Sequence, residues 1–587
     1  MAYCATAARH ALGGDVGEFA TVAVTGGAAH PPGYPLYALY VHAMRWLPAS
    51  SPAHAAALGN ALIACATIGA LLAACRAWGA SALAGCLAVA AWALAPITWA
   101  EATHAEVFAM NAMFASVILW LAAPQPPLPP GRTAILLALV AGLALTNHHT
   151  IAGMAPVGLL AAVTAVRRCE RRASLVATAA VSMFVIGLAP YAYLFAVHER
   201  GVDPSTWSWG DVHDWSGFVA TLRRDEYTGT MKTLVPSPGL TLGQLGRLVL
   251  ELLGLPLAIL AALATRLGRQ SGPSGGVRRL PWAALALAFV LLVVVSPVLQ
   301  CGPAPASPFE LTQSGVARAV VERLYLLPAT LLVPAIAVSL DVLARWTPSP
   351  LRTSAAACGA LVSVVLVGLA RGVPDMRARD RPTVELYAEN ALLAAPQDAV
   401  ILGEGDARLG SFLYARYALG LRPDVVFVNP RLLLAPWYHE RVERALGTAL
   451  PPVVNRELRV VPLVDALLGS GRPVFITDDF APAALAQYPS YPVGPLVRLL
   501  TNWRDVPSPA RLAAINLDLA RRFEREPTPL PGPEPWCDDL LQDYARPWRA
   551  LADYARGHDD PEGARENDAR AARALAGLAP DGTPPSP

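Results

Sequence analysis

Long apolar runs alternate with short polar stretches over the first 371 residues of the chain. A helix that crosses a bilayer needs about 20 mainly apolar residues. Runs near this length predict about ten spans, at 53–75, 80–97, 104–122, 133–146, 150–166, 173–197, 244–265, 280–300, 321–342 and 353–371. The pattern therefore predicts an α-helical polytopic membrane protein with its transmembrane domain over residues 1–371.

The pattern changes after residue 371. The sequence here predicts a strand, a helix and two more strands, at AVILGEGD (399–406), a helical stretch, RPDVVFVNP and PVFIT. This order predicts an α/β domain over 372–507. Residues 508–577 are polar and predict a helical tail, and the Pro-rich residues 578–587 predict a disordered end. The lone Gly-x-Gly of GEGD is weak evidence for phosphate binding, because glycines at the end of a strand usually form a turn.

Basic residues fall on one side of the predicted spans. Arg167, Arg168, Arg171 and Arg172 lie in one of an alternating set of loops that is rich in arginine and poor in acids, and such loops stay in the cytoplasm. We therefore expect a bacterial inner-membrane protein whose other loops and C-terminal domain face the periplasm. Residues 1–12 resemble the tail of a missing first span.

Composition agrees with this class and excludes others. The chain is 54% hydrophobic and only 15% charged, whereas soluble domains hold about 25% charged residues. A net charge of +2 gives no basis for binding nucleic acid. Eight cysteines without a Cys-x-x-Cys pair argue against a zinc site or a disulfide framework.

The first candidate chemistry is at GGDVGEF, which holds Asp15 and Glu18. Two acids three residues apart share a face if the segment is helical, and neighbouring carboxylates raise each other's pKa, so that one can act as a base. HPPGYP follows, with His30 and Tyr34 as binding candidates in a segment that its prolines hold rigid. The structural alternative is a turn at the membrane surface.

Three further candidates lie on the same predicted face. Glu101 and Glu106 are the only charged residues in the long apolar region around PITWAEATHAEVFAMN, and a carboxylate at the end of a span faces a cavity or a partner. Asn147 and His148 of TNHH lie at the same level. Adjacent histidines are poor joint metal ligands on one helix, so we expect a hydrogen-bonding role. Trp99 and Glu101 are alternatively anchors at the membrane interface.

The last candidates are basic. STWSWGDVHDW holds three tryptophans that suit the membrane interface or the face of a sugar, and it precedes Arg223 and Arg224. VERLYLLP places Glu322 and Arg323 where a span leaves the external face. Arginines there suit a lipid-linked phosphate, although an ordinary ion pair or a snorkelling arginine explains the same pattern.

Together these segments indicate a reaction between a lipid-carried substrate and an external acceptor. Nucleotide sugars are absent outside the cytoplasm, so a polyprenyl-phosphate sugar is the natural donor. A carboxylate then takes a proton from the acceptor hydroxyl, and positive groups stabilise the departing phosphate. The pair Asp15 and Glu18 fits the first role, and Arg323 or Arg223 with Arg224 fits the second.

The same motifs, in the same order, resemble the protein O-mannosyltransferase-like membrane proteins of the GT-C glycosyltransferase superfamily. The resemblance covers roughly residues 10–330, and GEGD…RPDVVFVN…WY is similar to the tail of bacterial members. The resemblance implies an inverting transferase, with mannose as the expected sugar and a protein or glycan as acceptor. It also implies Asp15 as the acidic catalytic residue, with Glu18 as its partner or substitute.

Two other functions compete with the enzyme. A transporter or flippase of lipid-linked sugars would place its polar residues near the bilayer midplane and within internal repeats, whereas here they cluster at one interface. A binding protein anchored by its spans would not need about ten of them. No cofactor is predicted with certainty. A divalent metal is left open, because Asp15, Glu18 and Glu106 suit such an ion, although no spacing indicates one.

Overall fold

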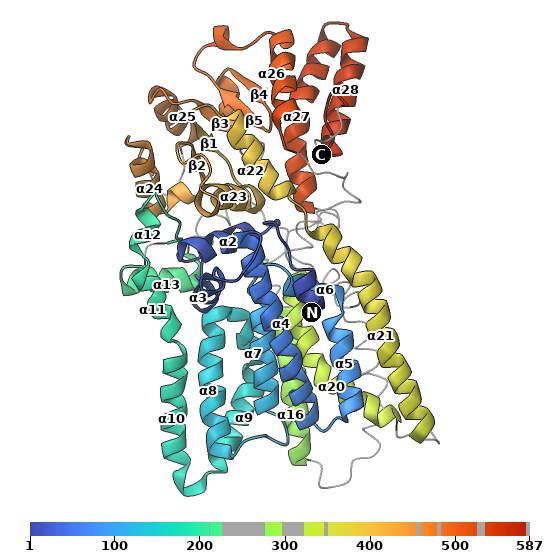
Figure 1. Cartoon of the computed structure of the whole chain (residues 1–587). Helices are drawn as coiled ribbons and strands as arrows, with labels where there is room; N and C mark the ends of the chain where they lie inside the picture. The colour runs from blue at the N-terminus through green and yellow to red at the C-terminus, as the bar shows by residue number, and fades with distance from the viewer. Residues whose placement is uncertain are drawn as a thin grey trace.

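The computed structural model describes residues 1–210, 212–225, 250, 276–295, 322–344, 350–453, 459–477, 480, 483–524 and 535–582. A bundle of long helices forms one end of the molecule, and an α/β domain with the C-terminal helices forms the other (Figure 1). The predicted span at 244–265 and the last residues of the predicted disordered end lie outside the described residues.

The bundle is built from apolar helices that bury their surface against one another. Its helices are α4 (Pro52–Ala77), α5 (Ala82–Ala93), α6 (Pro96–Ala102), α7 (Phe108–Leu121), α8 (Pro130–Asn147), α9 (Ala155–Arg167), α10 (Ala173–Gly187), α16 (Gly276–Val290), α20 (Leu326–Ala344) and α21 (Pro350–Arg379). Close packing depends on small residues, as in other membrane bundles. A Cβ on Gly142 of α8 would lie 2.4 Å from the Phe184 carbonyl oxygen of α10.

Six helical segments of the described residues are long and apolar enough to cross a bilayer, and the pair α5 and α6, bent by 70°, makes a seventh. The predicted span at 104–122 is shorter than expected, because the helix begins only at Phe108. Residues 103–107 are not helical, so α6 and α7 do not form one continuous helix. The predicted span at 280–300 corresponds to an apolar helix at Pro281–Val293.

Short helices connect the bundle to the α/β domain. They are α1 (Ala2–Ala5), α2 (Val16–Thr25), α3 (Pro35–Met44), α11 (Ala192–Ala196), α12 (Glu199–Val202) and α13 (Trp215–Arg223). Helix α2 lies between the bundle and the α/β domain (Figure 1). Asp15 is the capping residue before its first turn. Gly26 is the capping residue after its last turn, which it closes in a left-handed conformation (φ 62°).

The predicted α/β domain is confirmed. Its five strands are β1 (Val400–Leu402), β2 (Val426–Val428), β3 (Val474–Ile476), β4 (Ser490–Val493) and β5 (Leu496–Leu499), in the order β2-β1-β3-β5-β4. Strand β1 runs parallel to β2 and β3, with Val400 opposite both Val426 and Val474. Strand β5 is antiparallel to β3 and β4. The three apolar parallel strands are covered on both faces, as their composition requires.

Helices surround this sheet and extend beyond it. They are α22 (Thr383–Ala394), α23 (Asp406–Leu413), α24 (Pro436–Leu446), α25 (Val460–Gly469), α26 (Pro509–Arg522), α27 (Pro535–Gly557) and α28 (Pro561–Leu575). Arg408 of α23 is buried and donates to both oxygens of Asp543 on α27, at 3.1 Å each. A buried charge is tolerated only when it is paired in this way, so the pair fastens α27 to α23.

The segment before α2 is fastened to the C-terminal domain. The backbone nitrogen of Arg9 donates to Asp380 at 2.7 Å, and His10 Nδ1 lies 3.0 Å from Glu385 of α22. The hydrogen bond with Glu385 raises the pKa of His10 above its ordinary value, although partial burial opposes this. His10 is therefore charged in the folded protein at a higher pH than in the unfolded chain.

A raised pKa makes the contribution of His10 to stability depend on pH. This contribution is fully present below the unfolded pKa of about 6.5 and is lost as pH rises through the folded value. We expect the difference in unfolding temperature between the wild type and His10→Gln to shrink from pH 5.5 to pH 8.5, measured in detergent. The matched control is His558→Gln, since His558 bonds only the Tyr554 carbonyl of its own helix. A difference that stays constant with pH would contradict the assignment.

Candidate functional site

Three charged residues from distant parts of the chain meet at the end of the bundle. Arg323 begins the last turn before α20, and its Nη1 donates to Asp15 Oδ2 at 3.0 Å and to Glu106 Oε1 at 2.8 Å. Asp15 begins α2, and Glu106 lies in the non-helical stretch between α6 and α7. The side chain of Asp15 is 19% exposed, whereas that of Glu106 is 3% exposed.

Asn60 of α4 explains how Glu106 reaches this place. Its Nδ2 donates to the carbonyl oxygens of His104 and Glu106 at 2.6 and 2.7 Å, and its Oδ1 accepts from the Tyr37 hydroxyl at 2.9 Å. Backbone that leaves a helix at membrane depth needs such partners, because water cannot supply them. One buried amide therefore holds the break that turns Glu106 toward Arg323.

Glu18 belongs to a second set of contacts beside the first. Its two oxygens accept from the backbone nitrogen of His30 at 2.9 Å and from His30 Nδ1 at 2.6 Å. The Tyr34 hydroxyl lies 3.2 Å from Nε2 of the same ring, and the Tyr34 ring stacks on His148 with 5.6 Å between centroids. We call Asp15, Glu18, His30, Glu106 and Arg323 the acidic site.

The two carboxylates that contact Arg323 differ in charge. Burial raises the pKa of Glu106 to about 8, although Arg323 opposes the shift. Burial acts in the same direction on Asp15, but the charges of Arg323, His30 and Arg224 outweigh it and lower the pKa of Asp15. The expectation that paired acids would raise the pKa of Asp15 is therefore wrong. Asp15 is the ionised carboxylate of this pair at neutral pH.

His30 carries the second positive charge of the acidic site. Burial opposes this charge, but Tyr34, Glu18 and Asp15 raise the pKa of His30 well above its ordinary value. Glu18 and His30 thus form an ion pair at neutral pH. Both Glu18 oxygens are used in that pair, which leaves Asp15 better placed to accept a proton from a substrate.

Asp15, Glu18 and His30 are ligands of a kind that suits a divalent ion. Each offers one ligand atom, and the three atoms lie within 4.8 Å of one another. A ligating histidine is neutral, so an ion bound here would replace the proton between His30 Nδ1 and Glu18.

Buried acceptors without a partner lie around the acidic site. Among the described residues, no hydrogen bond reaches Oε2 of Glu106 or Oδ1 of Asn147. Asn147 uses its Nδ2 to donate to the Val107 carbonyl at 3.2 Å. A buried polar atom left without a partner is costly, so these oxygens suit a ligand that brings hydroxyl groups.

The remaining predicted residues lie at different distances from the acidic site. His148 Nδ1 bonds the Thr150 hydroxyl at 2.6 Å. Arg224 is half-buried and its charge acts on both Asp15 and His148, whereas Arg223 is exposed. Glu322 is half-buried next to Arg323. The sequence analysis predicted Asp15, Glu106 and Arg323 on one face of the membrane domain. In the structure, Arg323 contacts both carboxylates.

The tryptophans of the STWSWG segment do not lie where they were expected. Trp207 and Trp209 are 1% and 7% exposed and pack into the apolar core around Trp437 of the α/β domain. Arg441 holds this segment by donating to the carbonyl of Thr206. Only Trp215 of the three is exposed, so the other two join the domains and are not interfacial anchors.

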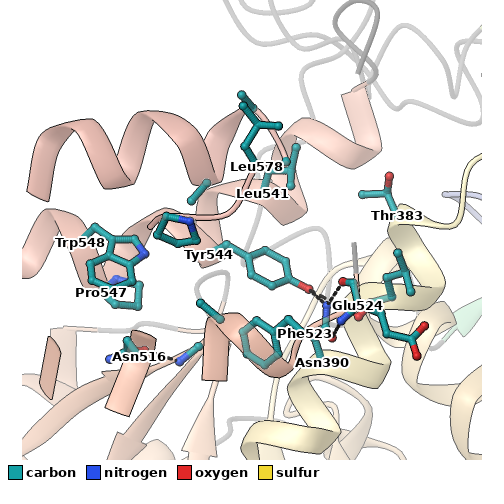
Figure 2. Close-up of a pocket in the computed structure, with 17 residues that line it drawn as sticks. Thr383, Asn390, Asn516, Phe523, Glu524, Leu541, Tyr544, Pro547, Trp548 and Leu578 are labelled. Carbon is teal, nitrogen blue, oxygen red and sulfur yellow. Dashed lines mark hydrogen bonds between the residues drawn. The ribbon is translucent and has the colours of Figure 1, made fainter. Parts of the chain in front are cut away.

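A cavity of about 720 Å³ lies elsewhere, among α22, α26, α27 and α28 (Figure 2). Its wall is mainly apolar, with Phe523 and Trp548. Asn390 bonds the Tyr544 hydroxyl and the Glu524 carbonyl within this wall. No residue of the acidic site lines the cavity, and the amides of Asn390 and Asn516 in its wall are already hydrogen-bonded. The convergent charges and unpartnered acceptors therefore place the candidate site at the end of the bundle.

The fold defines the class of protein. Crystal structures of ArnT from Cupriavidus metallidurans, in the apo state and bound to undecaprenyl phosphate, superpose on this chain with TM-scores of 0.52 and 0.50. Each is 15% identical and covers 86% of this chain and 97% of ArnT. The chain is a polytopic membrane protein with a GT-C fold, and the predicted fold class is confirmed.

Sequence comparison names the relatives. Residues 15–172 match the family model described as the Protein O-mannosyl-transferase TMEM260 N-terminal domain. Protein O-mannosyl-transferase TMEM260 of Mus musculus is 27% identical over 465 residues, which are 75% of this chain and 62% of the mouse protein. The Dictyostelium discoideum protein of the same name is 25% identical over 236 residues, 38% of this chain and 28% of that protein. The resemblance to the protein O-mannosyltransferase-like family is confirmed.

Proposed function

We propose that the protein is a membrane glycosyltransferase that moves a sugar from a polyprenyl-phosphate donor to a hydroxyl group of a protein. The observation that carries this proposal is the contact of Arg323 with Asp15 at the end of the bundle, beside buried acceptors without partners. The names of the sequence relatives support a protein acceptor and mannose as the sugar. The undecaprenyl phosphate bound by ArnT supports a lipid-linked donor.

The proposed reaction uses few protein groups. Asp15 removes the proton of the acceptor hydroxyl while its oxygen attacks the anomeric carbon of the sugar. The bond from that carbon to the phosphate oxygen breaks, and the lipid phosphate leaves with the electron pair. Attack opposite the leaving group inverts the configuration at the anomeric carbon. Glu106 and Asn147 accept hydrogen bonds from the sugar hydroxyls.

Arg323 is suited to stabilise the leaving phosphate. Both of its hydrogen bonds to described residues use Nη1. Its Nε and Nη2 form the other edge of the guanidinium and have no partner among those residues. This edge donates two parallel hydrogen bonds to a phosphate. The lipid phosphate thus comes to the residue that also holds Asp15 in place.

The proposed orientation puts the acidic site and the α/β domain on the periplasmic side of a bacterial inner membrane. The arginine-rich loops at the other end of the bundle support it. The alternative transporter function gains no support from the acidic site, because its polar groups lie at the end of the bundle and not at mid-depth.

The proposal is tested by an assay of sugar transfer. Membranes that contain the full chain receive polyprenyl-phosphate mannose labelled in the sugar, and labelled protein is collected after lipid extraction. We expect label that mild alkali releases from serine or threonine, and, in the intact glycopeptide before release, an anomeric configuration opposite to that of the donor. Donors carrying glucose or galactose determine the sugar. A folded protein that transfers label from none of these donors would refute the proposal.

A further inference from the structure

The α/β domain covers helix α2 at very short range. A Cβ on Gly17 of α2 would lie 2.5 Å from the carbonyl oxygen of Gly410 on α23. Only a glycine at position 17 permits this approach of the two backbones. Helix α23 therefore rests directly on the segment that carries Asp15 and Glu18.

Asp406 lies at the first turn of α23, on the GEGD turn that follows β1. Residues four apart share a helix face, so Asp406 lies on the same side of α23 as Gly410, the side that contacts α2. Asp406 is exposed, and it makes no hydrogen bond or ion pair with another residue of the described ranges. Its neighbour Glu404, by contrast, is paired with Arg431 at 2.7 Å.

The charges of the acidic site act on Asp406. Burial by the surrounding protein, together with the charges of Asp15 and Glu18, raises the pKa of Asp406 to about 6 against the opposing charges of His30 and Arg323. The side chain is nevertheless accessible to solvent. Asp406 thus lies beside the acidic site on its water-facing side.

Helix α23 is held firmly in this position. Behind it, buried Arg408 bonds Asp543 and also Asp539 at 2.6 Å, and the Tyr387 hydroxyl bonds Asp543 at 2.6 Å. A side chain on a helix fixed from both sides is placed more accurately than one on a loop.

We propose that Asp406 binds the protein acceptor and selects acceptor segments whose hydroxyl residue has basic or neutral neighbours over those with acidic neighbours. This inference rests on the proposed function. The donor arrives from the lipid and the acceptor from water, and Asp406 is the exposed, unpaired carboxylate on the water-facing side. A carboxylate there accepts hydrogen bonds from an incoming peptide and repels its acidic side chains.

The test compares acceptor kinetics in Asp406→Asn, Asp406→Glu and the wild type. Two peptides share one serine and differ only in flanking lysines or glutamates. We expect Asp406→Asn to raise KM for the lysine peptide about tenfold and to remove the preference over the glutamate peptide, with KM for the donor unchanged. Asp406→Glu keeps the charge and retains the preference. The matched control is Asp505→Asn, an exposed aspartate of the same domain, which leaves both constants unchanged.

The outcomes separate this inference from the proposed function. Wild-type transfer with an unchanged acceptor KM and preference in Asp406→Asn would overturn the role of Asp406 and leave the transferase standing. A change confined to the donor KM would also overturn it. If the wild type transfers nothing from any donor, the proposed function fails, and the inference fails with it. The unfolding temperature of each variant confirms that the protein is folded.

Discussion

Asp15→Asn is expected to lower the rate of sugar transfer at least about a thousandfold, because a positioned general base contributes about 10²–10⁴ and the substitution also removes a charge that orients Arg323. Asparagine keeps the shape of the side chain and its contact with Arg323. The measurement is the initial rate with labelled donor and saturating acceptor, in membranes matched for the amount of protein.

Glu18→Gln is the variant to compare with Asp15→Asn. Glu18 is tied to His30 through both oxygens, so its loss disturbs the site without removing the base. We expect a smaller decrease, about tenfold, since a charge-assisted hydrogen bond is worth roughly 1.5–3 kcal/mol. The reverse order, with Glu18→Gln inactive and Asp15→Asn active, would move the base from Asp15 to Glu18.

The second large effect is expected at Arg323. Replacing it by methionine removes the guanidinium that donates to both Asp15 and Glu106, and removing one partner of a buried ion pair costs about 3–5 kcal/mol. Arg323→Met should therefore lower the unfolding temperature by several degrees and abolish transfer. Both are measured on detergent-purified protein, the first by thermal unfolding and the second with labelled donor.

A double variant separates stability from chemistry. Glu106→Gln removes one of the two carboxylates that face Arg323, so Arg323→Met with Glu106→Gln should regain much of the lost stability. Transfer should stay absent, because the guanidinium edge that binds the leaving phosphate is gone. Normal transfer by Arg323→Met, or a double variant that regains activity with stability, would refute the phosphate-binding role.

The sequence predicted the membrane domain and the residues at its polar end, because both depend on local patterns. Apolar length gives the spans, and a carboxylate or arginine at the end of a span points to a cavity. Asp15, Glu106 and Arg323 are each visible in this way. Their contact depends on Asn60. This residue is a polar side chain within an apolar helix, and the sequence did not show that it holds the backbone around Glu106.

Asp406 could not have been predicted, since GEGD looks like any turn after a strand. Its place follows from the docking of α23 on α2, which the close approach of Gly17 and Gly410 makes possible. Trp207 and Trp209 were misplaced for the same reason. An aromatic cluster near a membrane suggests the interface, and only tertiary packing shows that these rings join the core of the α/β domain.

The covering of α2 by α23 also sets an order of events during biosynthesis. The ribosome makes α2 at the beginning of the chain and α23 only after the helices of the bundle. A nascent protein whose spans are already inserted still has the backbone around Gly17 uncovered, and the tryptophans of the STWSWG segment lack their core. A domain made after the bundle thus covers a helix made before it, and a product truncated before α23 leaves the surface beside Asp15 and Glu18 open to proteases.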